Sequence, residues 1–320
     1  MRPTCVQLEL TYLCNNACLF CYNHLASAVA ASHNEGLLTE EWESTIADLA
    51  RYGVFSVNFN GGEPLAHKDF FRLVDFAVSK GLDVHLNTNG TLVSKQNVQL
   101  LAQRFKAACI SFHGAESSVH DAIVGRRGAF EDALNGFCLM YDYGIYMAVN
   151  VVLSRLNLKS FPDILAFLRK HGVQTVLLTR VLTKELRLAI SDVEFMRALS
   201  YLRDFEMRNG EYERVAFPQP IRLCECTDVE LRTYVSEHNI ACAAGLITAR
   251  VSPSGHVTPC PLMNDPVFGN VKEEPFSEIW ERVDQSGWSR RLPFSDRCEH
   301  CVSLRKCGGG CIPQNDGLLI

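Results

Sequence analysis

The segment Cys14-Asn-Asn-Ala-Cys18-Leu-Phe-Cys21 is the most informative stretch of this chain. It places three cysteines on one short loop, directly after a strand-like segment. Three thiolates at this spacing can hold three corners of a cubane iron–sulfur cluster and leave the fourth iron without a protein ligand. An open metal position can bind and activate a small molecule. Zinc is the alternative, because a structural zinc site needs four ligands and His24 could supply the fourth.

Strand-like and helix-like segments alternate on both sides of this loop. Strands are predicted over residues 6–10, 54–59, 84–86, 108–112, 146–153 and 175–182, and helices over 39–49, 69–80, 130–143 and 192–208, with a further helix after Phe161. Thr39 is the predicted N-cap of the first helix, because Glu40 and Glu41 follow it. Regular alternation predicts an α/β fold with parallel strands and right-handed crossovers. Six such units are too few for an eight-fold barrel.

The composition narrows the class of protein. Of the 320 residues, 47% are hydrophobic and 21% are charged, which is typical of a globular chain. The net charge of −5 argues against a nucleic-acid partner, since such domains are usually basic. The sequence has no apolar run of about 18 residues, so we expect no membrane partner. A strand predicted so close to Met1 leaves no room for a signal peptide, and we expect a cytoplasmic protein.

The chain has 14 cysteines. In a reduced compartment, clustered cysteines indicate metal ligands or catalytic groups rather than disulfides. Three stand alone in apolar settings and are predicted to be buried core residues: Cys5, Cys109 and Cys138. The others form three groups along the chain: Cys14, Cys18 and Cys21; Cys224, Cys226, Cys242 and Cys260; and Cys298, Cys301, Cys307 and Cys311.

The pattern changes beyond residue 209. Residues 210–320 are rich in Pro, Gly and Cys, with a predicted hairpin around residues 252–255 and a short helix over 276–283. We therefore predict two domains, 1–209 and 210–320. The final cysteines follow Cys298-x2-Cys301-x5-Cys307-x3-Cys311, a spacing that suits either iron–sulfur clusters or a zinc ribbon.

A second motif lies at the end of the second predicted strand, Gly61-Gly62-Glu63-Pro64. Adjacent glycines let the backbone approach a ligand closely, and Glu63 can accept hydrogen bonds from an ammonium group. Alone, this motif would usually be a turn. Together with the cysteine loop it resembles the radical S-adenosylmethionine (SAM) superfamily, over residues 4–183. The resemblance implies a partial (β/α)6 barrel, in agreement with the six predicted units.

The resemblance also assigns roles to individual residues. Cys14, Cys18 and Cys21 would hold a [4Fe–4S] cluster whose fourth iron is chelated by SAM. Cleavage of SAM would then give a 5′-deoxyadenosyl radical that removes hydrogen from a substrate. The SAM contacts implied are Phe20 near the adenine, Gly61, Gly62 and Glu63 at the amino group, and, more weakly, Asn87 to Asn89, Ser111 and Asn150. Arg126 or Arg127 would pair with the SAM carboxylate. His113 departs from the family, where many members have Asp.

The C-terminal cysteines, with Gly255-x4-Cys260, resemble the SPASM extension of radical SAM enzymes, which holds one or two auxiliary iron–sulfur clusters. By this resemblance the first cluster would use Cys242, Cys260, Cys311 and either Cys224 or Cys226. The second would use Cys298, Cys301 and Cys307. Its fourth ligand stays open between the other of Cys224 and Cys226, Asp316, water and substrate, since the family's seventh SPASM cysteine is missing.

The resemblance points to an oxidoreductase that modifies a peptide by oxidation or cross-linking, with a ribosomal natural-product precursor as the expected substrate. Because the predicted barrel begins almost at Met1, we expect no fused leader-binding domain; the expected partners are a separate leader-binding protein and an electron donor such as flavodoxin or ferredoxin. Pro261 stands where the related sulfatase maturases have an Asp that acts as a catalytic base. This difference argues against sulfatase maturation. The first alternative is a tetrapyrrole or other small-molecule substrate, whose carboxylates could pair with Arg180, Arg222 or Arg250. The second is a non-catalytic zinc-binding module.

Overall fold

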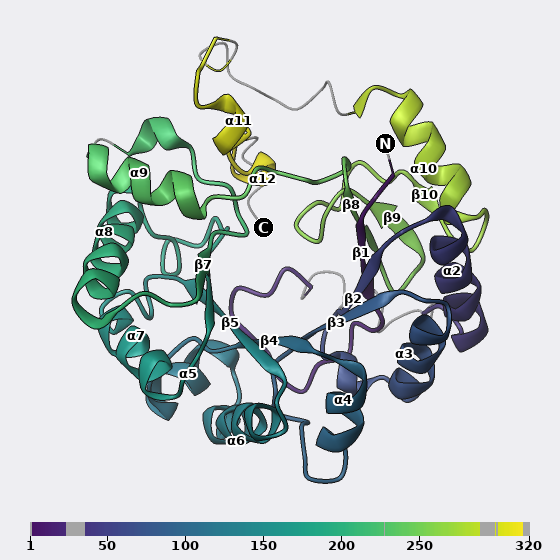
Figure 1. Cartoon of the computed structure of the whole chain (residues 1–320), viewed down its shortest axis with the longest axis horizontal. Coiled ribbons are helices and arrows are strands. Elements are labelled where there is room, and N and C mark those ends of the chain that lie inside the picture. Colours follow the sequence, from purple (N-terminus) through teal and green to yellow (C-terminus); the bar gives the residue numbers. More distant parts are fainter. Residues whose placement is uncertain (1, 24–35, 227, 289–297, 299, 316–320) are drawn as a thin grey trace.

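The computed structural model describes residues 2–23, 36–226, 228–288, 298 and 300–315. Its centre is one sheet of ten strands in the order β10-β9-β8-β1-β2-β3-β4-β5-β6-β7. The sheet is strongly curved and carries helices on its outer, convex face (Figure 1). The predicted α/β fold with a partial barrel is confirmed.

The six predicted strands form the middle of this sheet in chain order. All neighbours among them are parallel, and the apolar side chains at every second position are buried, such as Val149 and Val151 of β5. This alternation is typical of strands that pack one face into the core. Their bounds are β1 Cys5–Glu9, β2 Ser56–Asn60, β3 Asp83–Thr88, β4 Ala107–Ser111, β5 Tyr146–Leu153 and β6 Thr175–Arg180.

Helices connect these strands and pack on the outside of the sheet (Figure 1). They are α2 Thr39–Tyr52, α3 Phe70–Ser79, α4 Val98–Arg104, α5 Ser117–Val124, α6 Ala129–Asp142, α7 Phe161–Lys170 and α8 Asp192–Asn209, with the short η1 Pro64–Ala66. The side chains of Trp42, Ile46 and Leu49 are fully buried, as helical spacing predicts. The predicted N-cap was wrong by one residue: Leu38 is the N-cap, and Thr39 instead donates to Asp69.

The remaining elements continue the same sheet rather than forming a separate one. They are β7 Arg214–Ala216, η2 Leu223–Glu225, α9 Val229–His238, β8 Thr248–Val251, β9 His256–Thr258, β10 Gly269–Asn270, α10 Phe276–Gln285, α11 Leu304–Cys307 and α12 Ile312–Asn315. The predicted hairpin is β8–β9. In addition, β7 extends the sheet beyond β6, and β8 pairs in parallel with β1. The domain boundary at residues 209 and 210 stays a prediction.

Two buried polar contacts tie the late elements to the barrel. Arg250 of β8 forms an ion pair with Glu9 of β1 at 2.5 Å, and neither side chain is more than 3% exposed. Asp48 of α2 accepts hydrogen bonds from the backbone and side chain of Ser277, at the start of α10. These contacts fix β8 and α10 against the first turn of the barrel.

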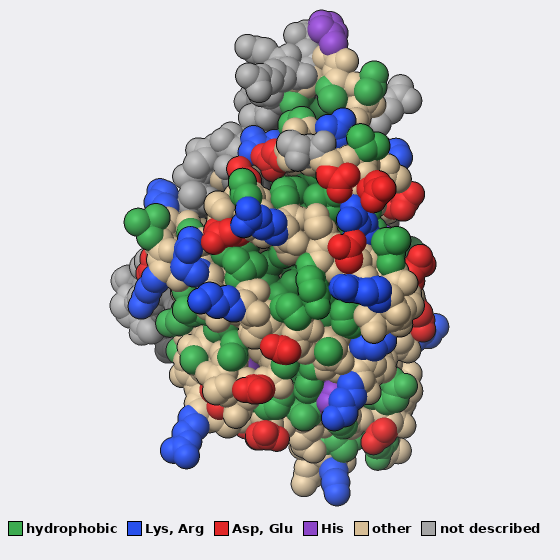
Figure 2. Space-filling model, turned by 90° about the vertical axis from the view of Figure 1, so that its left-hand side faces the viewer, with side chains coloured by type: hydrophobic (Ala, Val, Ile, Leu, Met, Phe, Trp, Pro, Cys, Tyr) green, Lys and Arg blue, Asp and Glu red, His purple; other side chains and the backbone are tan. Residues whose placement is uncertain are grey.

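Acidic and basic side chains are intermingled on the face made by α7, α8 and α9 (Figure 2). No large patch of a single charge is visible in this view. None of the helices in the described part of the chain is long and apolar enough to cross a membrane.

Candidate functional site

A cavity of about 520 Å³ lies inside the curved sheet, where the carboxyl ends of the parallel strands meet the C-terminal segment. Ligands in α/β folds usually bind at this end of the strands. The cavity brings together most of the residues that the sequence singled out: Cys14, Cys18, Phe20, Cys21, Gly61, Gly62, Asn87, Ser111, Asn150, Cys242, Cys260 and Cys311 all line it.

The loop that carries the first three cysteines is held by backbone bonds to the end of α5. Ala17 N donates to Val124 O at 2.8 Å, and Leu19 N donates to Ile123 O at 3.0 Å. Beyond the loop, Tyr22 donates from its hydroxyl to the buried Glu9 carboxylate. The cysteine loop is therefore attached at its middle and directly after its last cysteine.

The three thiols of this loop form a donor set that suits a metal cluster. Burial raises the pKa of Cys18 to about 12, and the neighbouring Cys21 and Cys14 raise it further by charge repulsion. Burial also raises the pKa of Cys14. Thiols so placed ionise readily only when cations compensate their charge, as iron does in a cluster. No three His, Cys, Asp or Glu side chains of the described residues converge on a single ion site. In a cubane each thiolate binds its own iron.

Gly61 and Gly62 allow the end of β2 to lie directly against the cysteine loop. A Cβ atom at Gly62 would lie 2.2 Å from Leu13 O, and one at Gly61 would lie 2.6 Å from Thr11 O. The same backbone forms hydrogen bonds across this contact, from Gly62 N to Thr11 O and from Glu63 N to Leu13 O. The two glycines therefore allow two segments of this chain to approach each other, and not only the approach of a ligand to the backbone.

Glu63 is fully buried and does not line the cavity. Its carboxylate accepts hydrogen bonds from Leu65 N, the Thr88 hydroxyl and Asn89 N. Burial raises its pKa to about 7, although these three donors lower it. Glu63 thus holds the turn after β3, and the predicted contact with the SAM amino group stays a prediction.

Arg126 and Arg127 differ in position. Arg127 is exposed. Arg126 donates from Nε to Asn16 of the cysteine loop at 2.8 Å and pairs through Nη1 with Asp132. Its Nη2 is buried without a hydrogen-bond partner among the described residues. Of the two arginines, Arg126 is therefore the one placed to receive an anion beside the loop.

His113 lines the cavity beside the cysteine loop, with its ring 4.9 Å from that of Phe20, edge to face. Its Nδ1 accepts a hydrogen bond from Val152 N, so the neutral ring carries its hydrogen on Nε2. Burial, and secondarily the neighbouring His120, holds the pKa of His113 well below its usual range. Where an Asp would bring a negative charge, this chain places an uncharged imidazole.

Three of the C-terminal cysteines reach the same cavity from the other side. Burial raises the pKa of Cys260 to about 12, and Cys242 contributes to the increase by charge repulsion. Cys242 also accepts a backbone hydrogen bond from Ile312, which follows Cys311. Cys242, Cys260 and Cys311 are thus brought together, as expected for three ligands of one auxiliary cluster.

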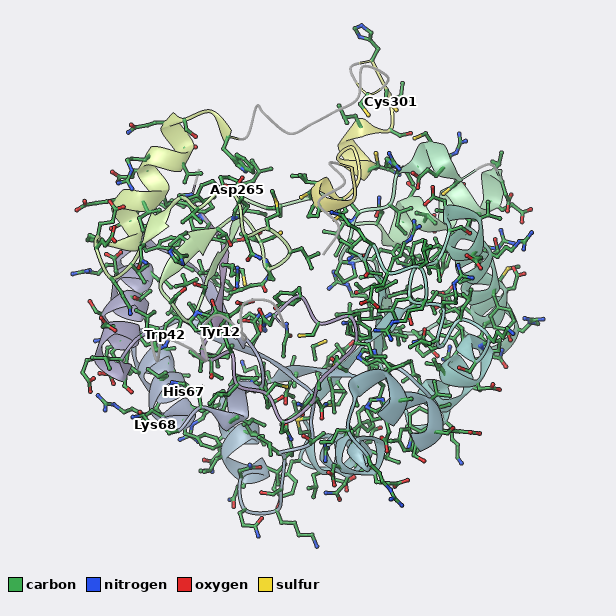
Figure 3. The ribbon with its side chains drawn as sticks, turned by 180° about the vertical axis from the view of Figure 1, so that it is seen from behind. Tyr12, Trp42, His67, Lys68, Asp265 and Cys301 are labelled. Carbon is green, nitrogen blue, oxygen red and sulfur yellow. The ribbon has the colours of Figure 1, made fainter. Side chains whose placement is uncertain are left out.

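The other predicted ligands do not line the cavity. Cys224 is exposed, whereas Cys226 is buried with its sulfur 3.8 Å from that of Met196. Cys301 lies on a segment that projects from the molecule, far from Tyr12 of the cysteine loop (Figure 3). Cys298 forms a turn with Cys301, and Cys307 is buried. His24 and Asp316 lie outside the described residues.

Several residues that line the cavity have no sequence pattern that indicates them, or only a weak one. His120 lies on α5, a helix that was not predicted, and no motif marks it. Thr179 donates to Asn150, and its place at the end of β6 could have indicated it. Gln219 lies between Pro218 and Pro220 on the cavity wall. The prediction that Cys138 is a core residue was wrong, because it lies exposed on α6.

Known proteins are similar to this chain in sequence and in fold. The family model of the radical SAM superfamily matches residues 8–168, and that of an iron–sulfur cluster-binding domain, SPASM, matches residues 242–302. An AdoMet-dependent heme synthase of Nitratidesulfovibrio vulgaris is 27% identical over 96% of this chain and 87% of its own. A mycofactocin maturase of Mycolicibacterium smegmatis is 27% identical over 97% of this chain and 78% of its own length. A PqqA peptide cyclase of Rhodopseudomonas palustris is 36% identical over 51% of this chain and 43% of its own length.

Among solved structures, SuiB of Streptococcus suis bound to S-adenosylmethionine superposes with a TM-score of 0.76 at 18% identity, over 97% of this chain and 73% of SuiB. Native anSMEcpe with bound AdoMet gives a TM-score of 0.75 at 18% identity, over 97% of this chain and 89% of anSMEcpe. A radical SAM domain uses a [4Fe–4S] cluster with SAM, and a SPASM domain holds auxiliary iron–sulfur clusters. This chain belongs to the radical SAM superfamily and carries a SPASM domain C-terminal to its radical SAM domain.

Proposed function

We propose that this protein is a radical SAM/SPASM oxidoreductase that removes hydrogen from a peptide and thereby oxidises or cross-links it. One observation carries the proposal: the cysteine loop and three SPASM cysteines, Cys242, Cys260 and Cys311, line the same cavity. A substrate bound there would lie between the site of radical formation and an auxiliary cluster. When bound, the [4Fe–4S] cluster supplies the electron that cleaves SAM, and the resulting radical removes the hydrogen.

The chain's own residues position the reactants and exclude water. We propose that Cys14, Cys18 and Cys21 hold the cluster, and that Gly61, Gly62 and Phe20 form the floor on which SAM lies. The apolar side chains of Val152, Val181, Leu182 and Ile240 also line the cavity. Such a lining keeps water away from a reactive carbon radical.

The charge of the cavity favours a peptide over a carboxylated tetrapyrrole. Arg180 is the one charged side chain in the described lining, and it pairs with Asp192 at 2.5 Å. Arg222 pairs with Glu225, and Arg250 pairs with Glu9. The three arginines considered for tetrapyrrole carboxylates thus already have acidic partners. An uncharged peptide segment would fit this wall without leaving a charge unpaired.

The relatives support both substrate classes. Mycofactocin maturase and PqqA peptide cyclase are named for peptide chemistry, and a SuiB structure contains its precursor peptide SuiA. The heme synthase matches over nearly the whole chain, however. A tetrapyrrole substrate is therefore the second candidate function.

A mass measurement separates the two candidates. The anaerobically reconstituted enzyme, with reductant and SAM, is incubated in parallel with short peptides encoded next to its gene and with iron coproporphyrin III. We expect a peptide to lose two hydrogens, a decrease of about 2 Da, while the porphyrin mass is unchanged. Conversion of the porphyrin with all peptides intact would establish the second candidate instead. The variant with Cys14, Cys18 and Cys21 changed to Ala should modify neither.

A further inference from the structure

We propose that Asn89 is a positioning residue for the cysteine loop, and that its side-chain N–H group, donated to the sulfur of Cys14, raises the reduction potential of the cluster held there. This inference rests on the proposed function in one respect, the placement of a cluster on Cys14, Cys18 and Cys21. It concerns the electron-transfer property of that cluster rather than the substrate.

Asn89 lies in the turn after β3 and reaches across to the cysteine loop. Its Nδ2 lies 3.7 Å from Cys14 Sγ and 2.9 Å from Asn15 Oδ1. Both are within hydrogen-bond range, since bonds to sulfur are longer than bonds to oxygen. One amide group therefore contacts both a proposed iron ligand and the residue that follows it.

The orientation of this amide is fixed by its other end. Asn89 Oδ1 accepts hydrogen bonds from the backbone N of Thr91 at 3.0 Å and from its hydroxyl at 2.7 Å. Asn15 Nδ2 donates in turn to the Thr91 hydroxyl at 2.7 Å. The three side chains close a ring of hydrogen bonds. With the oxygen turned towards two donors, the Asn89 N–H groups must face the loop.

The backbone of Asn89 is held from behind by Glu63. Glu63 Oε2 accepts from Asn89 N at 2.8 Å, while Oε1 accepts from the Thr88 hydroxyl at 2.7 Å. Because Glu63 is fully buried, this support is shielded from water. The Gly-Gly-Glu motif is thereby linked to the cysteine loop through Asn89, in addition to its direct backbone contact.

A hydrogen bond to a cluster sulfur stabilises negative charge on the cluster. Because reduction adds one negative charge, such a bond favours the reduced form and raises the potential. Cys14 Sγ has a second donor, Asn16 N at 3.4 Å. Removal of Asn89 Nδ2 should therefore lower the potential without abolishing all hydrogen bonding to this sulfur.

The test is an EPR-monitored redox titration of the reconstituted protein without SAM. The spectrum of the variant with Cys14, Cys18 and Cys21 changed to Ala is subtracted, so that the auxiliary clusters do not contribute. Three variants are compared: Asn89→Ala, Asn89→Asp and, as a matched control, Asn60→Ala. Asn60 lines the same cavity, but its amide donates to Gln7, outside the loop.

We expect the midpoint potential to fall in Asn89→Ala and to fall further in Asn89→Asp, which keeps the oxygen facing Thr91 but brings a carboxylate to Cys14. Asn60→Ala should match the wild type. Unchanged potentials in both Asn89 variants would overturn the inference, and loss of the cluster's iron from both would overturn its claim about the potential by reducing Asn89 to a structural support of the loop. If the wild-type spectrum does not differ from that of the triple cysteine variant, the cluster placement itself fails instead.

Discussion

At Gly62, the addition of a single methyl group should disturb the candidate site. Its Cβ position is occupied by backbone atoms, with Leu13 O at 2.2 Å and Tyr12 O at 2.7 Å. Backbone cannot rotate away as a side chain can, so Gly62→Ala should displace the cysteine loop. We expect a loss of about 1–3 kcal/mol in the free energy of unfolding, typical of overpacking, together with reduced iron content.

Gly36 provides the matched control for this substitution, because no atom lies within 4 Å of its Cβ position. Gly36→Ala should keep the melting temperature and the iron content of the wild type. If Gly62→Ala also keeps both, the contact between the glycine motif and the cysteine loop is not as close as described.

The buried histidines predict a dependence of stability on pH. Burial lowers the pKa of His120 to about 4. The unfolded chain takes up a proton near pH 6.5, but the folded chain does not, so the free energy of unfolding falls as the pH falls from 6.5 towards 4. The loss is up to about 1.4 kcal/mol per pH unit.

His120→Asn isolates this effect. The Asn oxygen can accept the hydrogen bond that His120 Nδ1 accepts from His113 N, but it cannot titrate. Urea unfolding of both proteins at pH 6.5 and 5.5 should therefore show a smaller loss of stability in the variant. Equal losses would mean that His120 is protonated in the folded protein.

At the scale of elements, the ion pair between Glu9 and Arg250 determines how β8 is fixed to β1. Arg250→Met would leave Glu9 buried with Tyr22 as its remaining donor, and the loss of one partner of a buried pair costs about 3–5 kcal/mol. The double variant Glu9→Gln with Arg250→Met removes both charges and should recover part of this loss. Urea unfolding measures both. A double variant as unstable as Arg250→Met alone would contradict the argument.

The same elements show how far the sequence alone could go. The six central strands were predictable because apolar residues recur at every second position, and these are the positions that the fold buries, as in residues 146–153. The parallel pairing of β8 with β1 was not predictable, since it joins segments about 240 residues apart and no local pattern specifies a partner. The helices α4, α5 and α9 were not predicted; they have 7, 8 and 10 residues, so few positions carry the helical period.

For the site, motifs with a fixed spacing were more informative than isolated residues. Two motifs could be recognised because their residues are close together in the sequence: the cysteine loop and the pair Gly61 and Gly62. The structure places both motifs on one cavity. The network of Asn15, Asn89 and Thr91 has no such signal, because its members meet only after folding. Their roles, like those of all the site residues, stay predictions until they are measured.

At the scale of the whole molecule, the fold brings the cysteine loop and three C-terminal cysteines, Cys242, Cys260 and Cys311, to one cavity, and Arg180 is the one charged side chain in its described lining. Residues separated by more than 200 positions in the chain share its walls. This arrangement makes the account depend on one property, that the N-terminal triplet holds the cluster at which SAM is cleaved.

The release of 5′-deoxyadenosine tests that property most directly. The anaerobically reconstituted wild type is reduced in the presence of SAM and compared with the variant carrying Cys14→Ala, Cys18→Ala and Cys21→Ala. We predict that the wild type releases 5′-deoxyadenosine and that the variant releases none, although it keeps the iron of its SPASM domain. Release by the variant at the wild-type rate, or none from a reduced wild type with its clusters intact, would contradict the account.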